Sequence, residues 1–252
     1  MTAKLYGGYP TYGEVIGILK LETVDPKVPG DIGNATSYSF PVKYKIVKGA
    51  TTDRLVEKND PMLLDLFICA AKELENEGVR AITTSCGFTA IFQKEMAEVL
   101  EIPVFMSSLI QVPLVSSMLA KNKKVGILTA NKRKLIKKHL EAVNIINIPV
   151  CIAGMEEQEN FSNMILKQQP FGDIEKIEKE VVEVSKNLVK QNPQTGAIVL
   201  ECADMPPFAA AVQEAVGLPV FDINTLINYV YNAVVQKRYS GFYPGYRAKR
   251  LL

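Results

Sequence analysis

Two cysteines in matching surroundings are the residues of this chain that most clearly suggest chemistry. Cys86 follows residues 81–85 (Ala-Ile-Thr-Thr-Ser), and Cys202 follows residues 197–201 (Ala-Ile-Val-Leu-Glu). Each segment begins with Ala-Ile, so the two thiols occupy the same place in frames offset by 116 residues (202 − 86). At that offset Phe92 also matches Phe208, and Pro-Val-Phe at 103–105 matches 219–221. Free cysteine is usually a small buried hydrophobe, but recurrence in a duplicated frame favours a function.

Paired thiols at the ends of two strands suit proton transfer to and from carbon. Each cysteine is predicted to end a strand and to precede a helix, whose N-terminus lowers a thiol pKa from about 8.5. Ligands bind at that edge of open parallel sheets. If two related halves face each other, one thiol can remove a proton while the other supplies one to the opposite face. We therefore expect Cys86 and Cys202 to be catalytic, without a cofactor.

The other cysteines and the single histidine are expected to play no part in this chemistry. Cys69 and Cys151 are predicted to be small buried hydrophobes. The four cysteines lack metal-ligand spacing, so no metal is expected. His139 ends a basic segment at 132–139 that is predicted to be an exposed helical surface. Ser–His–Asp or Cys–His catalysis therefore has little support.

Strand and helix patterns alternate along both halves of the chain. Short apolar runs predict strands, and apolar residues repeated at spacings of three and four predict helices. The predicted strands lie at 15–21, 42–47, 81–85, 103–105, 124–129, 197–201 and 219–221, and the predicted helices at 61–77, 89–100, 107–121, 174–191, 207–216 and 224–237. This alternation predicts parallel sheets flanked by helices.

The predicted fold class is α/β, with two pseudo-symmetric domains and the active site in the cleft between them. The first domain comprises residues 1–112 plus 224–252, and the second comprises 113–223, because the last helix is expected to return to the first half. Residues 22–50 form an insertion rich in turn residues. A loop of that length is typical of a lid or binding loop.

Composition and charge exclude several classes of protein. Hydrophobic residues make up 48% of the 252 and charged residues 22%, as in ordinary globular proteins. The net charge of +2 gives no reason to expect nucleic-acid binding, and no GxGxxG or GxxxxGK[ST] pattern suggests a nucleotide. No apolar run approaches the roughly 18 to 20 residues of a membrane span, and no export signal opens the sequence. We expect a cytoplasmic protein with reduced thiols and no membrane partner.

The two cysteine motifs resemble those of the aspartate/glutamate/hydantoin racemase superfamily. The motifs are residues 83–88 (Thr-Thr-Ser-Cys-Gly-Phe) and 200–206 (Leu-Glu-Cys-Ala-Asp-Met-Pro), and 17–19 (Gly-Ile-Leu) and 30–34 (Gly-Asp-Ile-Gly-Asn) resemble an uncharacterised branch. The resemblance covers nearly the whole chain. It implies a cofactor-independent racemase or epimerase with two pseudo-symmetric α/β domains, in which the two cysteines match the acid–base thiols.

The neighbours of both cysteines depart from the pattern of many amino-acid racemases in this superfamily. There the first cysteine is commonly followed by Asn-Thr, whereas Gly-Phe stands at 87–88 here. The second motif there commonly reads Gly-Cys-Thr-Glu or Gly-Cys-Thr-His, whereas residues 201–204 read Glu-Cys-Ala-Asp. Because such neighbours help to place the charged groups of the substrate, the motifs leave the substrate open.

Seven further residues are candidates for substrate binding because they lie beside the thiols or at a neighbouring strand end. They are Thr84, Ser85, Gly87, Phe88, Asn131, Ala203 and Asp204. The hydroxyls of Thr84 and Ser85 would either bind a carboxylate or satisfy the strand end. Asn131 would contact substrate or cap a helix. Asp204 would assist Cys202 or serve as an N-cap.

The sequence thus predicts a racemase or epimerase that inverts the carbon next to a carboxylate, as in aspartate or glutamate, by two-base transfer between Cys86 and Cys202. One alternative is a cysteine-dependent isomerase or decarboxylase of a dicarboxylic acid, similar to maleate isomerase or arylmalonate decarboxylase. Another is a non-catalytic protein that binds small anions. A small-molecule carboxylate is the expected partner, and a homodimer is the expected assembly.

Overall fold

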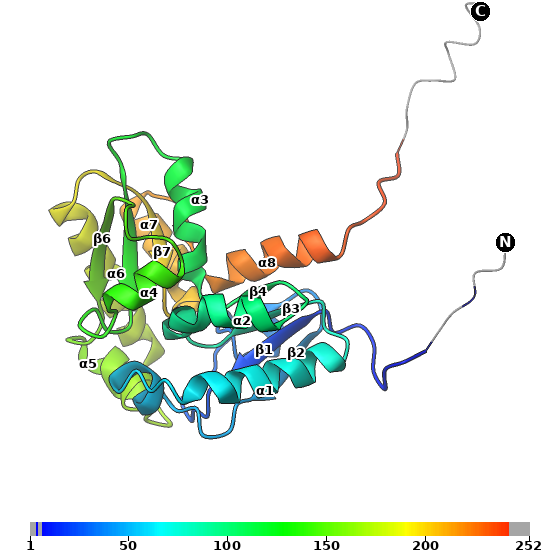
Figure 1. Cartoon of the computed structure of the whole chain (residues 1–252). Coiled ribbons are helices and arrows are strands. Elements are labelled where there is room, and N and C mark those ends of the chain that lie inside the picture. Colours follow the sequence, from blue (N-terminus) through cyan, green and yellow to red (C-terminus); the bar gives the residue numbers. More distant parts are fainter. Residues whose placement is uncertain (1–3, 5–6, 242–252) are drawn as a thin grey trace, which may run out of the picture.

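Two parallel four-stranded sheets organise the computed structural model, which describes residue 4 and residues 7–241 (Figure 1). The first sheet has the strand order β2 (Val42–Ile46), β1 (Ile16–Lys20), β3 (Ala81–Thr84) and β4 (Val104–Phe105). The second has the equivalent order β6 (Val150–Gly154), β5 (Lys124–Thr129), β7 (Thr195–Leu200) and β8 (Val220–Phe221). All neighbouring strands are parallel. The predicted α/β fold with two similar sheets is confirmed.

The strand registers also repeat between the sheets. Gly17 of β1 pairs with Ile82 of β3, and Gly126 of β5 pairs with Ile198 of β7 in the equivalent place. A methyl group at Gly17 would lie 2.9 Å from Leu74, closer than side chains tolerate. The glycine therefore allows the helix that carries Leu74 to pack closely on the strand.

Helices cover the sheets (Figure 1). The long ones are α1 (Leu63–Asn76), α6 (Ile174–Gln191) and α8 (Ile223–Val234), where apolar periodicity predicts them. The shorter helical segments are η1 (Ala35–Ser37), η2 (Asp53–Glu57), η3 (Gly87–Phe92), α2 (Gln93–Val99), η4 (Ser108–Gln111), α3 (Val112–Ser117), α4 (Lys137–Ala142), α5 (Glu159–Phe161), η5 (Ser162–Leu166), η6 (Pro206–Phe208) and α7 (Ala209–Val216).

The helix predicted at 107–121 is shorter in the structure. It consists of the 3-10 turn η4 and then α3, with Pro113 in the first turn of α3. Proline has no N–H to donate, so the two turns do not merge into one continuous α-helix. The chain then turns, with the N–H of Lys123 donating to the carbonyl of Ala120 at 2.8 Å, and enters β5.

The last helix returns the chain to the first sheet. Ile223 and Ile227 of α8 are buried in one cluster with Ile16 and Ile18 of β1. The domain boundaries given above stay a prediction, and residues 1–3, 5–6 and 242–252 of the first predicted domain lie outside the described residues.

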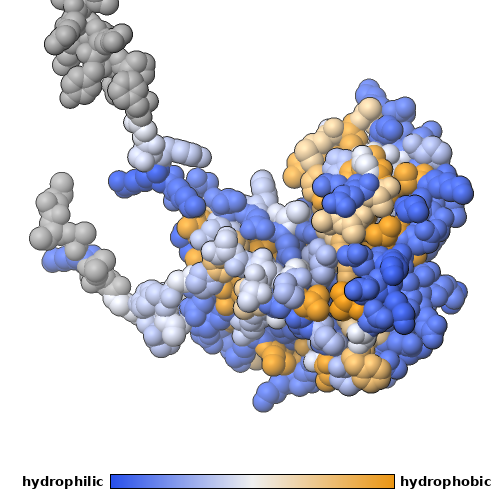
Figure 2. All heavy atoms as spheres, turned by 180° about the vertical axis from the view of Figure 1, so that it is seen from behind, coloured by the Kyte–Doolittle hydropathy of each residue, from blue (hydrophilic) through white to orange (hydrophobic). Residues whose placement is uncertain are grey.

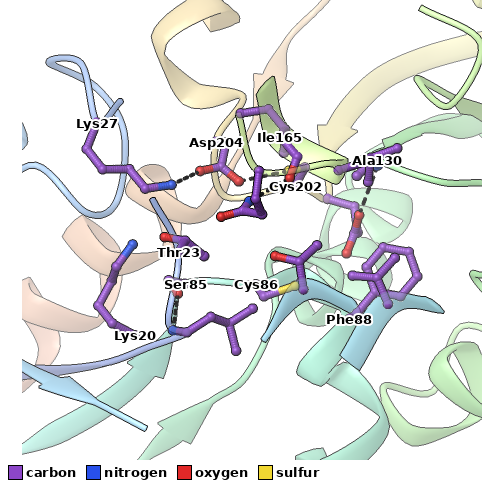
Figure 3. Close-up of a pocket in the computed structure, with 17 residues that line it drawn as sticks. Lys20, Thr23, Lys27, Ser85, Cys86, Phe88, Ala130, Ile165, Cys202 and Asp204 are labelled. Carbon is purple, nitrogen blue, oxygen red and sulfur yellow. Dashed lines mark hydrogen bonds and ion pairs between the residues drawn. The ribbon is translucent and has the colours of Figure 1, made fainter. Parts of the chain in front are cut away.

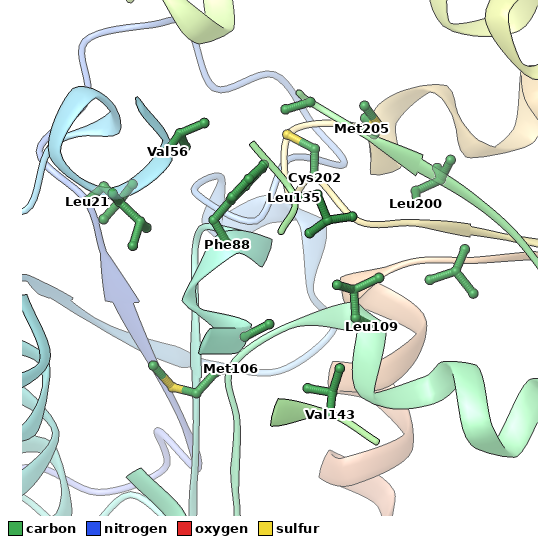
Figure 4. Packing of buried hydrophobic residues seen from close by; sticks show 14 of the residues in the cluster. Leu21, Val56, Phe88, Met106, Leu109, Leu135, Val143, Leu200, Cys202 and Met205 are labelled. Atoms are coloured by element: carbon green, nitrogen blue, oxygen red, sulfur yellow. The ribbon is translucent and has the colours of Figure 1, made fainter. Parts of the chain in front are cut away.

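One hydrophobic core continues through both halves. It contains Leu21 and Phe88 from the first half and Leu135 and Cys202 from the second. Figure 4 shows Phe88 between Leu21 and Val56 on one side and Cys202 on the other. Because apolar surface of both halves is buried against Phe88, the halves are held together next to the second cysteine.

The 22–34 loop of the insertion reaches across to the second half. The N–H of Val24 donates to Gln168 Oε1 of the second half at 3.1 Å. The carbonyl of Gly30 accepts from Asn224 Nδ2 of α8, in the first predicted domain, at 2.6 Å. Gly30 has φ +97°, and a methyl group there would lie 2.9 Å from Pro207. Glycine is required at this position both for its φ and for the close approach.

The surface is mainly hydrophilic on the face that Figure 2 shows, with hydrophobic residues in separate patches. Across residues 7–241 and residue 4, no helix is long and apolar enough to cross a membrane. Cys69, predicted to be buried, is exposed, because it lies on the outer side of α1. Cys151 is buried as predicted.

Candidate active site

A narrow pocket lies where strands from both sheets end (Figure 3). Lys20 is the last residue of β1, Cys86 follows β3, Ala130 follows β5 and Cys202 follows β7, and all four line the pocket. The carboxyl ends of parallel strands are the usual place for ligands in α/β folds. The structure therefore brings the two thiols to one pocket between the halves.

The backbone at Cys86 is fixed by the hydroxyl groups that precede it. Ser85 Oγ accepts from the N–H of Leu21 at 3.0 Å. Thr84 Oγ1 donates to the carbonyl of Met106 at 3.1 Å. These bonds tie the end of β3 to its neighbours on either side, so the position of Cys86 is determined by buried backbone contacts.

Cys202 is linked to a buried ionic cluster. Its thiol donates to Asp204 Oδ2 at 3.5 Å, and Lys27 Nζ lies 2.6 Å from Asp204 Oδ1. The same ammonium lies 2.6 Å from Asp25 Oδ2 and 3.8 Å from Asp31 Oδ2. Figure 3 shows Lys27 pointing from its loop to Asp204. An ammonium from the first half thus holds the carboxylate that contacts a thiol of the second.

Glu201 lies between the two cysteine segments. Its Oε2 accepts from the Thr129 hydroxyl at 2.7 Å and from the N–H of Ala130 at 3.4 Å. Its Oε1 is buried and has no hydrogen-bond partner among the residues that the structure describes. A methyl group at Gly87 would overlap the Glu201 carboxylate. Glycine after Cys86 therefore makes room for the glutamate before Cys202.

Burial and acidic neighbours disfavour the thiolate form of both cysteines. Burial raises the pKa of the Cys86 thiol and Glu201 raises it further, against the N–H of Phe88. Burial, then Asp204 and Glu201, raise the pKa of Cys202. The expectation of thiol pKa values lowered by helix N-termini is therefore wrong, because desolvation and nearby carboxylates outweigh the backbone N–H groups.

The carboxyl groups differ in their charge state. Burial alone would raise the pKa of Asp204, but Lys27, Asp31 and Lys20 hold it at about 2. Burial raises the pKa of Glu201 to about 7, despite the hydrogen bonds from Thr129 and Ala130. Asp204 is therefore ionised at neutral pH, whereas Glu201 has a pKa close to neutral pH.

Some of the residues predicted to bind substrate line the pocket and others do not. Those that line it, besides the two thiols, are Ser85, Gly87, Phe88 and Asp204. Thr84 instead donates to a carbonyl at the end of β3 and β4, and Asn131 Oδ1 accepts from the N–H of Arg133 in the turn that follows β5. The carbonyl of Ala203 accepts from the N–H of Ile32 at 3.4 Å. The catalytic and binding roles themselves stay predictions.

Sequence patterns do not reveal the positions of four residues at or near the pocket. Lys20, Lys27 and Glu201 line the pocket. For Lys27, the only sequence feature that points to the pocket is the length of the loop in which it lies. His139, predicted to be exposed, is fully buried, with its ring edge-on to Phe88 at 5.3 Å between centroids. Because α4 begins only at Lys137, the basic residues before it lie in a turn and the histidine faces inward. Burial lowers the pKa of His139 to about 4.

No group of three or more His, Cys, Asp or Glu side chains is arranged to hold a metal ion within the described part of the chain.

The family of the chain can be assigned from its sequence. A family model described as Asp/Glu/Hydantoin racemase matches residues 49–227. The chain belongs to this family. Allantoin racemase from Pseudomonas fluorescens has the same fold, with a TM-score of 0.60 at 12% identity, over 90% of this chain and 99% of that one.

Relatives with a higher sequence identity than this racemase are named as lyases. A dimethylsulfoniopropionate lyase of Durusdinium sp. clade D is 32% identical over 214 residues, which cover 82% of this chain and 70% of that protein. Dimethylsulfoniopropionate lyase 7 of Emiliania huxleyi (strain CCMP1516) is 32% identical over 224 residues, which cover 84% of this chain and 65% of that protein. The chain thus spans about two thirds of the length of these members.

These relatives correct the reaction predicted from sequence. The prediction of an isomerase that inverts an α-carbon is contradicted, because the curated relatives at 32% identity are lyases. The physical reason is that the family's thiol motifs indicate removal of a proton next to a carboxylate. They do not determine whether the carbanion is reprotonated or expels another group.

Proposed function

We propose that this protein is a lyase that eliminates the β-substituent of a small carboxylate, with dimethylsulfoniopropionate as its substrate. The observation that carries the proposal is 32% identity, over 82% of the chain, to a protein named for that reaction. The pocket supports it, because the buried Cys202 and the partly buried Cys86 line a space with Lys20 on one side and Glu201 on the other.

The reaction follows from the structure of the substrate. Dimethylsulfoniopropionate has a carboxylate, an α-carbon and a β-carbon that bears a dimethylsulfonium group. A base takes a proton from the α-carbon, the electron pair forms the α–β double bond, and the carbon–sulfur bond breaks. The products are dimethyl sulfide and acrylate, and the base leaves protonated. One base is sufficient, so no proton donor on the opposite face is needed.

A thiolate of the Cys86 and Cys202 pair would be that base. Both thiols have raised pKa values, in part because Glu201 is close to each. A bound sulfonium cation would offset this negative charge and favour thiolate formation. The substrate itself would therefore help to generate the base that attacks it.

Lys20 would bind the carboxylate of the substrate. Its Nζ is buried without a hydrogen-bond partner in the part of the chain that the structure describes, and Figure 3 shows it on the side of Cys86 opposite to Phe88. Burial, followed by Lys27, lowers the pKa of Lys20. An incoming carboxylate would restore its charge, and the ion pair would make the α-proton easier to remove.

The direct test is to incubate the purified full chain with dimethylsulfoniopropionate. We expect dimethyl sulfide in the headspace and an equal amount of acrylate by NMR. The same assay in deuterated water, with D- and L-aspartate, D- and L-glutamate as comparison, should show no inversion of the amino acids. Absence of both products over a range of pH would refute the proposal.

Replacement of Lys20 by Met is expected to raise KM for the substrate by about tenfold or more, since a buried charge-assisted contact to the carboxylate is lost. The stability of the folded protein should change little, because this ammonium has no ion-pair partner among the described residues. Steady-state kinetics and urea unfolding measure the two effects. Lys45→Met, which removes a cation paired with Glu73 on the surface, is the control. An unchanged KM would exclude Lys20 from carboxylate binding.

A further inference from the structure

One buried acceptor of the pocket is left without a partner. Glu201 is 1% exposed, and its Oε1 accepts no hydrogen bond from the residues that the structure describes. A buried carboxylate oxygen is normally paired, because desolvation without a partner is costly. The carboxylate is nevertheless well positioned by Thr129 and Ala130 through its other oxygen. The free oxygen therefore calls for an explanation by something that enters the pocket.

Glu201 and Lys20 belong to opposite ends of the same pocket. Figure 3 shows Lys20 on one side of the two thiols and Ala130 and Phe88 on the other. Glu201 accepts from the N–H of Ala130, so it belongs to that second side. A zwitterion with its carboxylate at Lys20 would place its cationic end by Glu201, with the intervening carbons at the thiols.

The surroundings of Glu201 suit a particular kind of cation. An ammonium group carries N–H donors and requires several acceptors, whereas a sulfonium or quaternary ammonium group has only methyl groups around its charge. Such an onium group needs negative charge and apolar contact, and aromatic rings commonly recognise it. The free oxygen of Glu201, with the ring of Phe88 in the same pocket, provides both.

We infer that Glu201 is a specificity-determining residue that binds the onium group of the substrate by charge, and that Gly87 is present to leave room for it. This inference rests on the proposed function and specifies its substrate class: carboxylates with a permanently charged, fully alkylated onium group on the β-carbon. Primary ammonium compounds would be poorer ligands, since the free oxygen of Glu201 offers an acceptor to one of their three N–H groups, and each further N–H group requires another.

The test uses two ligands of the same shape that differ in charge. They are 3-(trimethylammonio)propanoate and 4,4-dimethylpentanoate, in which carbon replaces the charged nitrogen. Isothermal calorimetry measures the dissociation constant of each with the wild-type chain and with Glu201→Gln, while NMR checks that no acrylate forms. Glu183→Gln, an exposed glutamate on α6, is the matched control.

We expect wild type and Glu183→Gln to bind the cationic ligand about tenfold or more tightly than the neutral one. In Glu201→Gln the ratio should fall to about one, because the amide keeps the shape and the bonds from Thr129 and Ala130 but not the charge. A wild-type protein that binds both ligands equally would overturn the inference, even if the variant failed to fold. So would a Glu201→Gln variant that weakens both ligands by the same factor.

The outcome is separable from that of the proposed function. Binding of the two ligands requires no turnover, so a protein that releases no dimethyl sulfide but selects the cation through Glu201 would refute the lyase and retain the onium site. A protein that releases dimethyl sulfide with equal kcat/KM in wild type and Glu201→Gln would retain the lyase and refute the onium site.

Discussion

Serine in place of the cysteine that acts as the base is expected to lower kcat for elimination by about 100-fold or more, the usual contribution of a positioned general base. Serine preserves the shape of the side chain, but its hydroxyl is a far weaker acid, so almost no alkoxide is available. Cys86→Ser and Cys202→Ser are to be compared by the rate of dimethyl sulfide release. The two variants should differ, because elimination needs only one base.

A third cysteine variant serves as the control in this experiment. Cys69 is exposed on α1, away from the pocket, so Cys69→Ser should match the wild type. Thermal unfolding should show that all three variants fold. Full activity in both Cys86→Ser and Cys202→Ser would exclude the thiols as bases and with them the proposed mechanism.

Replacement of Lys27 by Met is expected to cost about 3 kcal/mol or more of unfolding free energy, because it leaves buried carboxylates without their counter-ion. Lys27 Nζ lies 2.6 Å from both Asp25 and Asp204, and the side chains of these two are 0% and 14% exposed. Activity should fall as well, since Asp204 would no longer be held against Cys202. Urea unfolding and the dimethyl sulfide assay measure the two losses.

The destabilisation by Lys27→Met should grow with pH. Burial and Asp204 already raise the pKa of Asp25, and raise that of Asp31 to about 8, while Lys27 lowers both. Without Lys27 these two pKa values rise further above those of the unfolded chain, and that of Asp204 rises from about 2. An acid with a raised folded pKa loses stability as pH rises through the interval between the two values. The difference from wild type should therefore be larger at pH 8 than at pH 5. Lys137→Met, which breaks an exposed pair with Glu141, should cost less than about 1 kcal/mol at either pH. A pH-independent difference would contradict the account.

The fold follows from signals that are local in sequence. Short apolar runs and the repeated Ala-Ile segments predict the strands, and these lie in equivalent registers, with Ile82 opposite Gly17 and Ile198 opposite Gly126. The same frames bring Cys86 and Cys202 to one pocket. Such predictions succeed because parallel strands align their carboxyl ends without further information.

The charges of the pocket could not be derived in this way. Lys27 lies in a loop, where no periodicity indicates which way a side chain points, and its partner Asp204 is 177 residues away. In the sequence, Gly87 and Glu201 are two separate departures from a racemase motif. Their contact in the structure shows that the two are related, because the space that a side chain at position 87 would fill is occupied by the Glu201 carboxylate. The homodimer and the small carboxylate partner stay predictions.

The place of β1 determines which part of the chain can be cut away. β1 lies between β2 and β3 in the first sheet. Lys20 is its last residue, and Lys27 lies in the loop that follows. The strand and both lysines precede residue 49, where the match to the family model begins. A recombinant fragment trimmed to 49–227 would keep both thiols but would lose β1 and β2, two of the four strands of the first sheet, and both pocket ammonium groups. The segment that identifies the family is therefore not the segment that carries the pocket's cationic side. Sorting relatives by what they bind requires comparison of the residues upstream of that match.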